Sequence, residues 1–223
     1  MIYRHLYVDA GFLYAYQAFH GNIRANVLKL CEKYAGKGGF LAKKKYFFDT
    51  EPNYPTQEQN DKLHKYHTVV KNLFGFNMEL GYFIPPSPEC PKGLQKGVDV
   101  KLAIAWVRDA IAIDVSKTRN VEFWLLSNDS DFSPLVDFAM KRNIQVHLIY
   151  AEFGTHALAS EYRKLKSSDL HLMQKEHLIE CEDKPEKKQS LAQVVRNAKP
   201  IEINMKKPGK SLGALKDLMA LKS

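Results

Sequence analysis

The sequence predicts an α/β protein with a central, mostly parallel sheet and helices on both of its faces. Short apolar segments with the length of strands alternate along the chain with longer segments of helical periodicity. This alternation is typical of parallel sheets, whose strands are joined by crossover helices. Several apolar segments end abruptly in carboxylates, and the carboxyl ends of parallel strands are where such folds bind ligands. A hydrophobic content of 45% is enough for a core of this kind.

The strand expected at the centre of the sheet is the segment 121–127. It runs from Val121 through Trp124 to Leu126 and then breaks off into polar residues. An apolar run of this length is typical of a strand that is buried on both faces. The same reasoning places shorter strands elsewhere, the last of them at an edge. We expect strands at residues 5–8, 46–48, 78–84, 121–127, 145–150 and 170–173.

Helices are expected between these strands, because apolar residues recur there at helical spacing. The segment 56–75 shows the pattern clearly, with Leu63, Tyr66 and Val70 on one face. Pro134 is well placed for a first helical turn. The proline-rich loop 85–91 is expected to be irregular and close to a functional rim. We expect helices at residues 12–19, 23–35, 56–75, 96–113, 134–142 and 155–166.

The charge distribution suggests one domain over residues 1–181 and a charged linker with a basic C-terminal tail over residues 182–223. The formal net charge is +8, of which +5 lies in the tail, where ten Lys or Arg face five Asp or Glu. A basic protein of this kind favours an anionic partner such as nucleic acid, although a basic soluble protein is the plainer interpretation. The tail could contact RNA, mediate a homodimer or dock a protein partner.

Cysteine usage and hydropathy indicate the compartment. Cys31, Cys90 and Cys181 are widely spaced and form no Cys-x-x-Cys motif, so neither a disulfide framework nor a structural zinc site is expected. No segment is long and apolar enough to cross a bilayer, and no secretory leader is evident. We therefore expect a soluble, cytoplasmic protein without membrane contact.

Carboxylates converge at one edge of the predicted sheet. Asp9, Asp129 and Asp131 follow strands, and Asp99 lies at the start of a helix whose N-terminus faces the same edge. Four carboxylates in one notch would repel each other unless a cation lay among them. Mg²⁺ or Mn²⁺ suits such oxygen ligands, and can orient a phosphodiester, activate a water and stabilise the leaving oxygen.

Each of these residues also has a plainer interpretation. Asp131 and Asp99 could cap the helices that follow them, and Asp9 could be a turn residue. Asp129 is the hardest to explain in this way, because a carboxylate after a buried strand is costly without a partner. The neighbouring polar side chains are candidates for contacts to a substrate phosphate. They are Lys96, Ser127, Asn128 and Ser130. Aromatic residues Phe12, Tyr14 and Tyr16 could stack on bases or simply pack.

Three sequence blocks resemble the NYN domains, the LabA-like branch of the PIN-like nuclease superfamily. The blocks are 7–14 (YVDAGFLY), 96–103 (KGVDVKLA) and 126–136 (LSNDSDFSPLV), and the likeness extends over roughly residues 1–175. The resemblance implies a three-layer α/β/α Rossmann-like fold with its first and fourth strands adjacent. It further implies a metal-dependent ribonuclease, with four residues matching the family's acidic positions. These are Asp9, Asp99, Asp129 and Asp131.

The chain departs from the family pattern at two positions. Phe12 stands where the family often has Asn, and Ala105 stands where a further Asp is usual. Asp109 lies one helical turn beyond Ala105 and would reach the site only if the helix were shifted. We therefore expect a divalent-metal-dependent endoribonuclease, and keep as the alternative a catalytically silent RNA-binding or regulatory adaptor. A metal-dependent phosphatase acting on a small substrate is a third possibility, which an enclosed pocket would favour.

Overall fold

The structure is a computed structural model that describes residues 2–37, 39–88, 90–91, 93–113 and 120–182. The weak helices that the sequence suggests between residues 191 and 221 lie outside these described residues, as does nearly all of the predicted tail. No helix within the described ranges has the length and apolar character needed to span a membrane.

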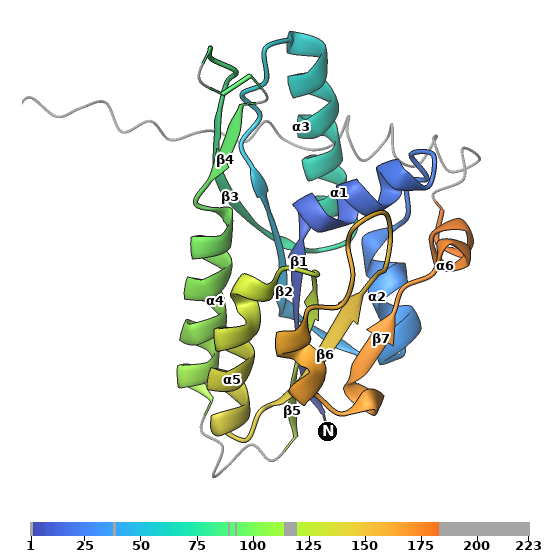
Figure 1. The fold of residues 1–223 in the computed structure, drawn as a ribbon, viewed down its shortest axis with the longest axis vertical. Helices are drawn as coiled ribbons and strands as arrows, with labels where there is room; N and C mark the ends of the chain where they lie inside the picture. Colours follow the sequence, from blue (N-terminus) through green and yellow to red (C-terminus); the bar gives the residue numbers. More distant parts are fainter. Residues whose placement is uncertain (1, 38, 89, 92, 114–119, 183–223) are drawn as a thin grey trace, which may run out of the picture.

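A seven-stranded sheet forms the middle layer (Figure 1), in the order β4-β3-β2-β1-β5-β6-β7. Every neighbouring pair is parallel except β3 and β4. The first and fourth of the predicted strands, β1 and β5, are therefore adjacent, as expected, with Val8 opposite Leu126. The strands are β1 (Tyr3–Asp9), β2 (Phe40–Thr50), β3 (Asn77–Ile84), β4 (Leu94–Lys96), β5 (Val121–Leu126), β6 (Gln145–Tyr150) and β7 (Leu170–Leu172).

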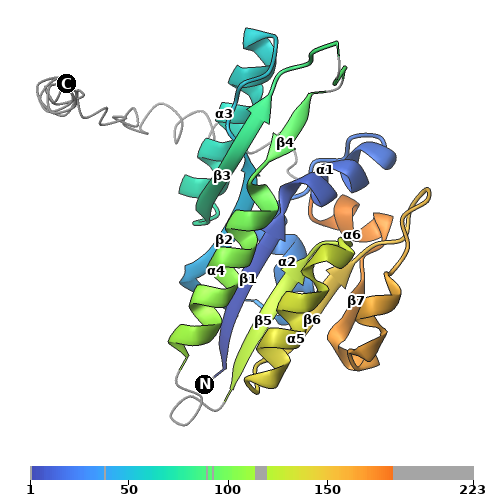
Figure 2. The same cartoon turned by 60° about the vertical axis from the view of Figure 1, so that its left-hand side comes forward.

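Helices cover both faces of the sheet, which gives the predicted three layers. In Figure 2, α4 and α5 lie together on one face, while α1 and α2 lie on the other. The helices are α1 (Ala10–Phe19), α2 (Val27–Ala35), α3 (Gln57–Asn72), α4 (Val98–Ala112), α5 (Ser133–Lys141) and α6 (Lys175–Glu180). Short 3-10 helices span Ser130–Phe132, Ser160–Lys164 and Ser167–Asp169.

Two hydrophobic clusters, one on each face, hold the layers together. Residues of β1 contribute to both clusters, because successive side chains of a strand point to opposite faces of the sheet. Leu6 and Val8 pack in the cluster beneath α1 and α2, whereas Tyr7 packs with Leu102 and Trp106 of α4. Because the central strands are buried on both faces, each of them appears in the sequence as a continuous apolar run.

Three local expectations were wrong. Residues 155–166 do not form a helix; the chain makes a tight turn in which Phe153 and His156 exchange backbone hydrogen bonds, followed by a short 3-10 helix. The helix expected at 23–35 begins only at Val27, because the Asn26 side chain caps it by accepting from the Lys29 amide. Lys96, expected to open a helix, ends β4 instead.

His67 lies on the lysine-containing helix α3, yet its side chain does not face solvent. It is buried, and its Nε2 lies 2.8 Å from the Asp49 carboxylate at the end of β2. A lysine-rich helical segment gave no hint of this partner, because the two residues are brought together only when α3 packs on the sheet.

Candidate active site

Asp9 ends β1 and caps α1 with the same carboxylate. Its Oδ1 accepts a hydrogen bond from the Phe12 amide at 3.3 Å, so Asp9 is the N-cap of the helix. Its Oδ2 accepts a bond of 2.8 Å from the Ser127 hydroxyl, which follows β5. Asp9 is thus more than a turn residue: its side chain is held in place by the two elements that meet at the carboxyl edge of the sheet.

The loop after β5 is ordered by its own polar side chains. The Asp129 amide donates to the Ser127 hydroxyl at 3.1 Å, and the Asp131 amide donates to Asp129 Oδ1 at 2.9 Å. The buried Tyr162 hydroxyl donates to the Asp129 carbonyl oxygen. Asp129, rather than Asp131, caps the short helix here, and α5 has no side-chain cap. The exposed Asp131 carboxylate is therefore left free of a capping role.

Asp99 lies in the first turn of α4, on its exposed side. The N-cap of α4 is Gly97, whose φ of 80° is in the left-handed region that favours glycine. Asp99 consequently does not cap the helix, although a carboxylate in the first turn interacts favourably with the helix dipole. This short connection from β4 into α4 brings Asp99 to the same edge as Asp9.

The four carboxylates lie close enough for neighbouring charges to act on the pKa of Asp9 and on that of Asp99. Burial raises the pKa of Asp9, hydrogen bonds from Ser127 and the Phe12 amide oppose this, and the charges of Asp99 and Asp129 raise it further. Burial likewise raises the pKa of Asp99, and the charges of Asp129 and Asp131 add to the effect. The structure thus gathers all four predicted carboxylates into one electrostatically coupled group.

Nothing positive neutralises this group among the residues that the structure describes. None of the four carboxylates forms an ion pair with a described Lys, Arg or His. Across the described ranges, no three His, Cys, Asp or Glu side chains are placed so that they could hold a metal ion together. The acidic group is therefore an unneutralised cluster rather than a closed, many-ligand metal cage.

The other predicted contact residues fall into two sets. Ser127 and Asn128 have their polar atoms engaged within the protein: the Asn128 amide donates to the Ala151 carbonyl at 2.5 Å and accepts from the Ala151 amide at 3.0 Å. Lys96 ends the exposed strand β4, and Ser130 begins the 3-10 helix beside Asp129. Lys96 and Ser130 are thus the better placed of the four to face a ligand.

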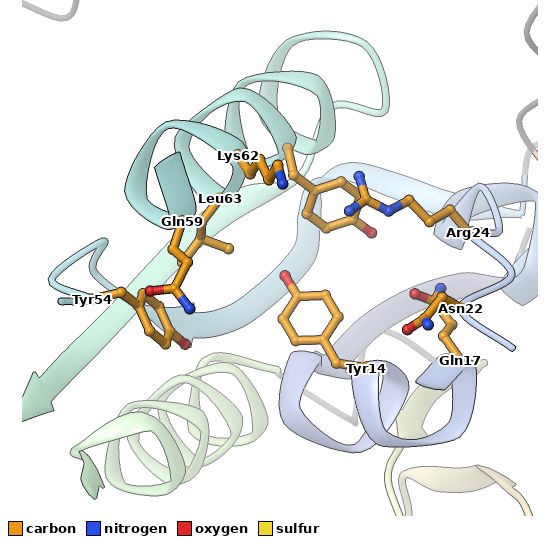
Figure 3. A pocket seen from close by; sticks show the side chains of 9 residues that line it. Tyr14, Gln17, Asn22, Arg24, Tyr54, Gln59, Lys62 and Leu63 are labelled. Atoms are coloured by element: carbon orange, nitrogen blue, oxygen red, sulfur yellow. The ribbon is translucent and has the colours of Figure 1, made fainter. Parts of the chain in front are cut away.

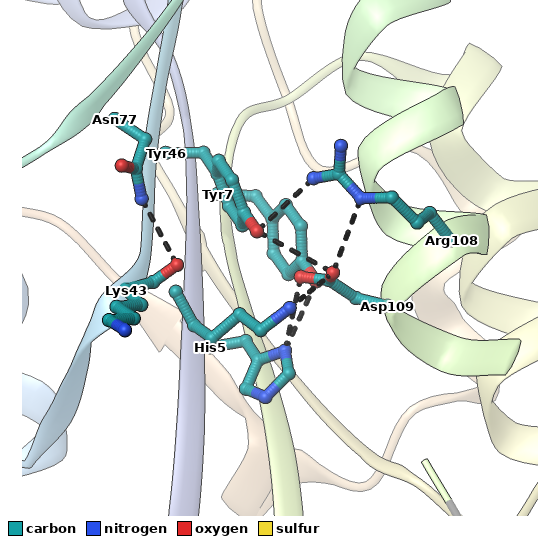
Figure 4. A network of polar contacts seen from close by, with 8 residues as sticks. His5, Tyr7, Lys43, Tyr46, Asn77, Arg108 and Asp109 are labelled. Carbon is teal, nitrogen blue, oxygen red and sulfur yellow. Dashed lines mark hydrogen bonds and ion pairs between the residues drawn. The ribbon is translucent and has the colours of Figure 1, made fainter. Parts of the chain in front are cut away.

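Asp109 does not join the acidic group. It is buried, 1% exposed, and lies in a network with His5, Tyr7 and Lys44 (Figure 4), whose atoms approach it to 3.4, 3.1 and 2.6 Å. His5 precedes Asp9 by four strand residues, or about 13 Å along β1. Asp109 therefore stabilises the middle of the sheet, well away from the carboxyl edge.

The two positions that depart from the family pattern are both filled by core residues. Ala105 is 2% exposed and packs in the cluster under α4. Phe12 is buried and its ring lies 6.1 Å from that of Phe153. Tyr16 is also buried, so of the three aromatic residues considered for base stacking, only Tyr14 remains available near the surface.

Comparison with known proteins gives the family. No curated protein matches the chain. Among solved structures, a protein of unknown function from Vibrio parahaemolyticus, VPA0982, is 16% identical with a TM-score of 0.48, and the match covers 78% of this chain and 94% of that one. The NYN domain family matches residues 5–169, which include all three sequence blocks and every carboxylate of the acidic group. The chain belongs to the NYN domain family.

Proposed function

We propose that this protein is a divalent-metal-dependent endoribonuclease of the LabA-like branch, and that its centre is the group formed by Asp9, Asp99, Asp129 and Asp131. Members of the NYN family belong to the PIN-like nucleases, which generally use divalent metals. The observation that carries the proposal is the coupling of four carboxylates that have no cationic partner among the described residues. Such an arrangement is costly unless a cation binds.

The donor set fits Mg²⁺ or Mn²⁺. Mg²⁺ is usually held by one or two carboxylates together with waters and substrate phosphates, so three converging protein ligands are not required. Asp9 and Asp129, which share Ser127 as a hydrogen-bond partner, would supply the primary ligands. Asp99 and Asp131 would hold the ion through water. The bound metal would supply Lewis acidity and activate a water for attack on phosphorus.

The protein's own residues position the reactants. Ser127 fixes the Asp9 carboxylate and the Asp129 amide, so that the ends of β1 and β5 keep a constant spacing. Lys96, exposed at the end of β4, would pair with the phosphate of the substrate, and Ser130 would donate to it. In the hydrolysis, water adds to phosphorus and the bond from phosphorus to one ester oxygen breaks. One product keeps the phosphate and the other receives the proton on its hydroxyl.

The substrate proposed is RNA, bound largely through its phosphates. The formal net charge of +8 favours a polyanion, and the basic tail over residues 182–223 is proposed to add to the backbone contacts. Binding dominated by phosphate contacts weakens linearly in a plot of log affinity against log salt concentration. The salt slope of RNA binding therefore reports how many phosphates the protein neutralises.

The decisive experiment is cleavage of labelled single-stranded and structured RNA with Mg²⁺ or Mn²⁺ by the native chain and by Asp129→Asn. Native cleavage that requires the metal and is lost in Asp129→Asn supports the proposal. Asp137→Asn is the matched control, because Asp137 lies on α5 in an ion pair with Lys164 and outside the acidic group. Equal cleavage by all three proteins would refute the assignment of the centre.

The alternative is a catalytically silent NYN-fold adaptor that binds RNA without cutting it. The specific observation in its favour is that the position of the further family carboxylate, Ala105, is occupied by a buried apolar residue. Native protein that binds RNA but leaves it intact with either metal would establish this function. The same binding and cleavage assays therefore separate the two candidates.

A further inference from the structure

A concave site lies between α1 and α3. It is a pocket of about 380 Å³, a size typical of sites for one small molecule or one residue of a polymer. Figure 3 shows Tyr14 from α1, Tyr54 from the loop before α3, and Gln59 and Lys62 from α3 around a common space. None of the four carboxylates of the acidic group lines this pocket.

The aromatic walls of the pocket are held rigidly before any ligand arrives. The Tyr14 hydroxyl donates to Asp49 at 2.6 Å, and His67 contacts the same carboxylate oxygen. The Tyr54 ring stacks on Phe83 of β3, with ring centroids 4.3 Å apart. Flat π-faces of this kind accept any nucleobase, and preorganised rings lose little conformational entropy on binding.

One polar side chain in the pocket lacks a partner. Gln17 lines the pocket and is 7% exposed, and its Nε2 finds no acceptor among the described residues. A buried amide without a hydrogen bond costs free energy. A ligand with a carbonyl or ring-nitrogen acceptor in its plane, as every nucleobase has, would satisfy this donor.

The rim of the pocket is basic. Arg24 and Lys62 both line it and are exposed, and Lys62 also pairs with Glu58 on its own helix at 2.6 Å. Cations around an aromatic slot suit a base whose sugar is attached to phosphates on either side. An uncharged apolar ligand would not need them.

The pocket is connected to the acidic group through two elements. Tyr14 lies three residues after Gly11 on α1, so the two share a helical face, and the Gly11 backbone borders Asp9 and the Gln95 side chain. On the other side, Phe83, on which Tyr54 stacks, is paired with Gln95 across β3 and β4. A strand of RNA lying over Asp9 would thus continue along α1 toward the pocket.

From these contacts we infer that the pocket binds one nucleobase of the RNA strand, close to the phosphate at the acidic group, with Tyr14 and Tyr54 as stacking walls and Gln17 as the donor to the base edge. This inference rests on the proposed function for its substrate. It adds a subsite that fixes where along the strand the phosphate meets the carboxylates.

The test measures binding separately from cleavage. Fluorescence anisotropy is recorded for a labelled single-stranded RNA and for a set of the same RNA with one base removed at each position in turn. Ca²⁺ replaces Mg²⁺ and Mn²⁺, and a gel verifies that the RNA stays intact. For the native full-length chain, loss of one particular base should weaken binding about 5- to 100-fold, as expected for one stacked base.

Substitutions in the pocket test whether this loss of RNA affinity arises there. Tyr54→Ala should weaken binding of the complete RNA by the same factor and abolish the penalty for the missing base, whereas Tyr54→Phe should behave as the native chain. Gln17→Met should weaken binding of the complete RNA without lowering the unfolding temperature, because it removes an unsatisfied buried group. Tyr3→Ala, at the opposite end of β1, is the aromatic control.

Three results would overturn the inference: native binding indifferent to the loss of every single base, a penalty that survives unchanged in Tyr54→Ala, or free nucleoside monophosphates bound as tightly as the RNA. Cleavage measured in parallel with Mn²⁺ keeps the two proposals apart. Pocket-dependent binding without cleavage upholds the subsite and refutes the nuclease, whereas cleavage without pocket dependence does the reverse.

Discussion

Ser127 donates a hydrogen bond of 2.8 Å to the Asp9 carboxylate and accepts one of 3.1 Å from the Asp129 amide. A single buried hydroxyl therefore joins a carboxylate at the end of β1 to the loop after β5, across the two adjacent central strands. Ser127 therefore helps to fix the position of Asp9 relative to Asp129.

Ser127→Ala is expected to lower the free energy of unfolding by about 1–3 kcal/mol, because the Asp129 amide and the Asp9 carboxylate each lose a hydrogen-bond partner. It should also lower RNA cleavage, since Asp9 would no longer be held in one orientation. Urea denaturation and initial cleavage rates measure the two effects. Ser130→Ala is the neighbouring control for stability and should be close to neutral in urea denaturation; an equal loss of stability in both variants would contradict the special role of Ser127.

Mg²⁺ or Mn²⁺ is expected to raise the unfolding temperature of the native chain. A cation that binds only the folded acidic group stabilises it by mass action and relieves repulsion among the carboxylates. Differential scanning fluorimetry with and without EDTA measures the shift. Asp129→Asn should respond much less, while Asp137→Asn should respond like the native chain; a shift of equal size in Asp129→Asn would place the ion elsewhere.

Asp109→Asn is expected to destabilise the protein by about 1.5–3 kcal/mol at neutral pH, because Lys44 and Tyr7 lose a charged hydrogen-bond acceptor. Burial alone would raise the pKa of Asp109, but hydrogen bonds from His5 and Lys44 and their charges outweigh it and hold the pKa well below its usual range. The stabilisation is therefore complete above the unfolded-state pKa of about 3.9 and is lost as the pH falls from there toward the folded-state pKa.

Urea denaturation of the native chain and Asp109→Asn at pH 7 and pH 3 tests this linkage. The difference in unfolding free energy between the two proteins should be smaller at pH 3, since the unfolded native chain then binds a proton at Asp109 that the folded chain does not, whereas Asp109→Asn has no such group. A difference that stays constant with pH would show that the variant acts through lost packing alone. RNA cleavage per folded molecule should be unchanged, because Asp109 lies outside the acidic group.

Substitutions of Asp9 are expected to separate its two roles. Asp9→Asn retains an acceptor for the Phe12 amide and should keep the stability of α1, whereas Asp9→Ala removes the cap at a cost of about 0.5–2 kcal/mol. Both should lose cleavage, since neither supplies a carboxylate. Circular dichroism melts and cleavage assays on the two variants make the comparison; activity retained in Asp9→Asn would show that Asp9 is only a helix cap.

Much of the architecture could be predicted because its signals are local. The apolar runs that become β1, β5 and β6 are continuous in the sequence, and the strand ends place Asp9 and Asp129 at one edge. By contrast, β4 has only three residues, all exposed, so no apolar pattern marks it. It forms because the backbone of Gly81 leaves room: a Cβ there would lie 2.5 Å from the Lys96 carbonyl oxygen.

The parts of the site that could not be predicted depend on long-range packing. Tyr14 and Gln17 are three residues apart on α1, but no spacing in the sequence relates them to Tyr54. His67 and Asp49 are eighteen residues apart and meet only through the packing of α3 on β2. Sequence patterns identify which residues are acidic or aromatic, but a shared pocket is a property of the assembled layers.

The central position of β1 has a consequence for how this chain is made. Asp9, at the end of β1, is synthesised well before the partner strand β5, which begins only at Val121. At translation rates of 5–20 residues per second, the first strand waits roughly 6–24 s for this partner. Until then one edge of β1 lacks its β5 neighbour, and a nascent or truncated chain cannot assemble the acidic group. A chain that ends before β5 therefore cannot bind a ligand at the acidic group.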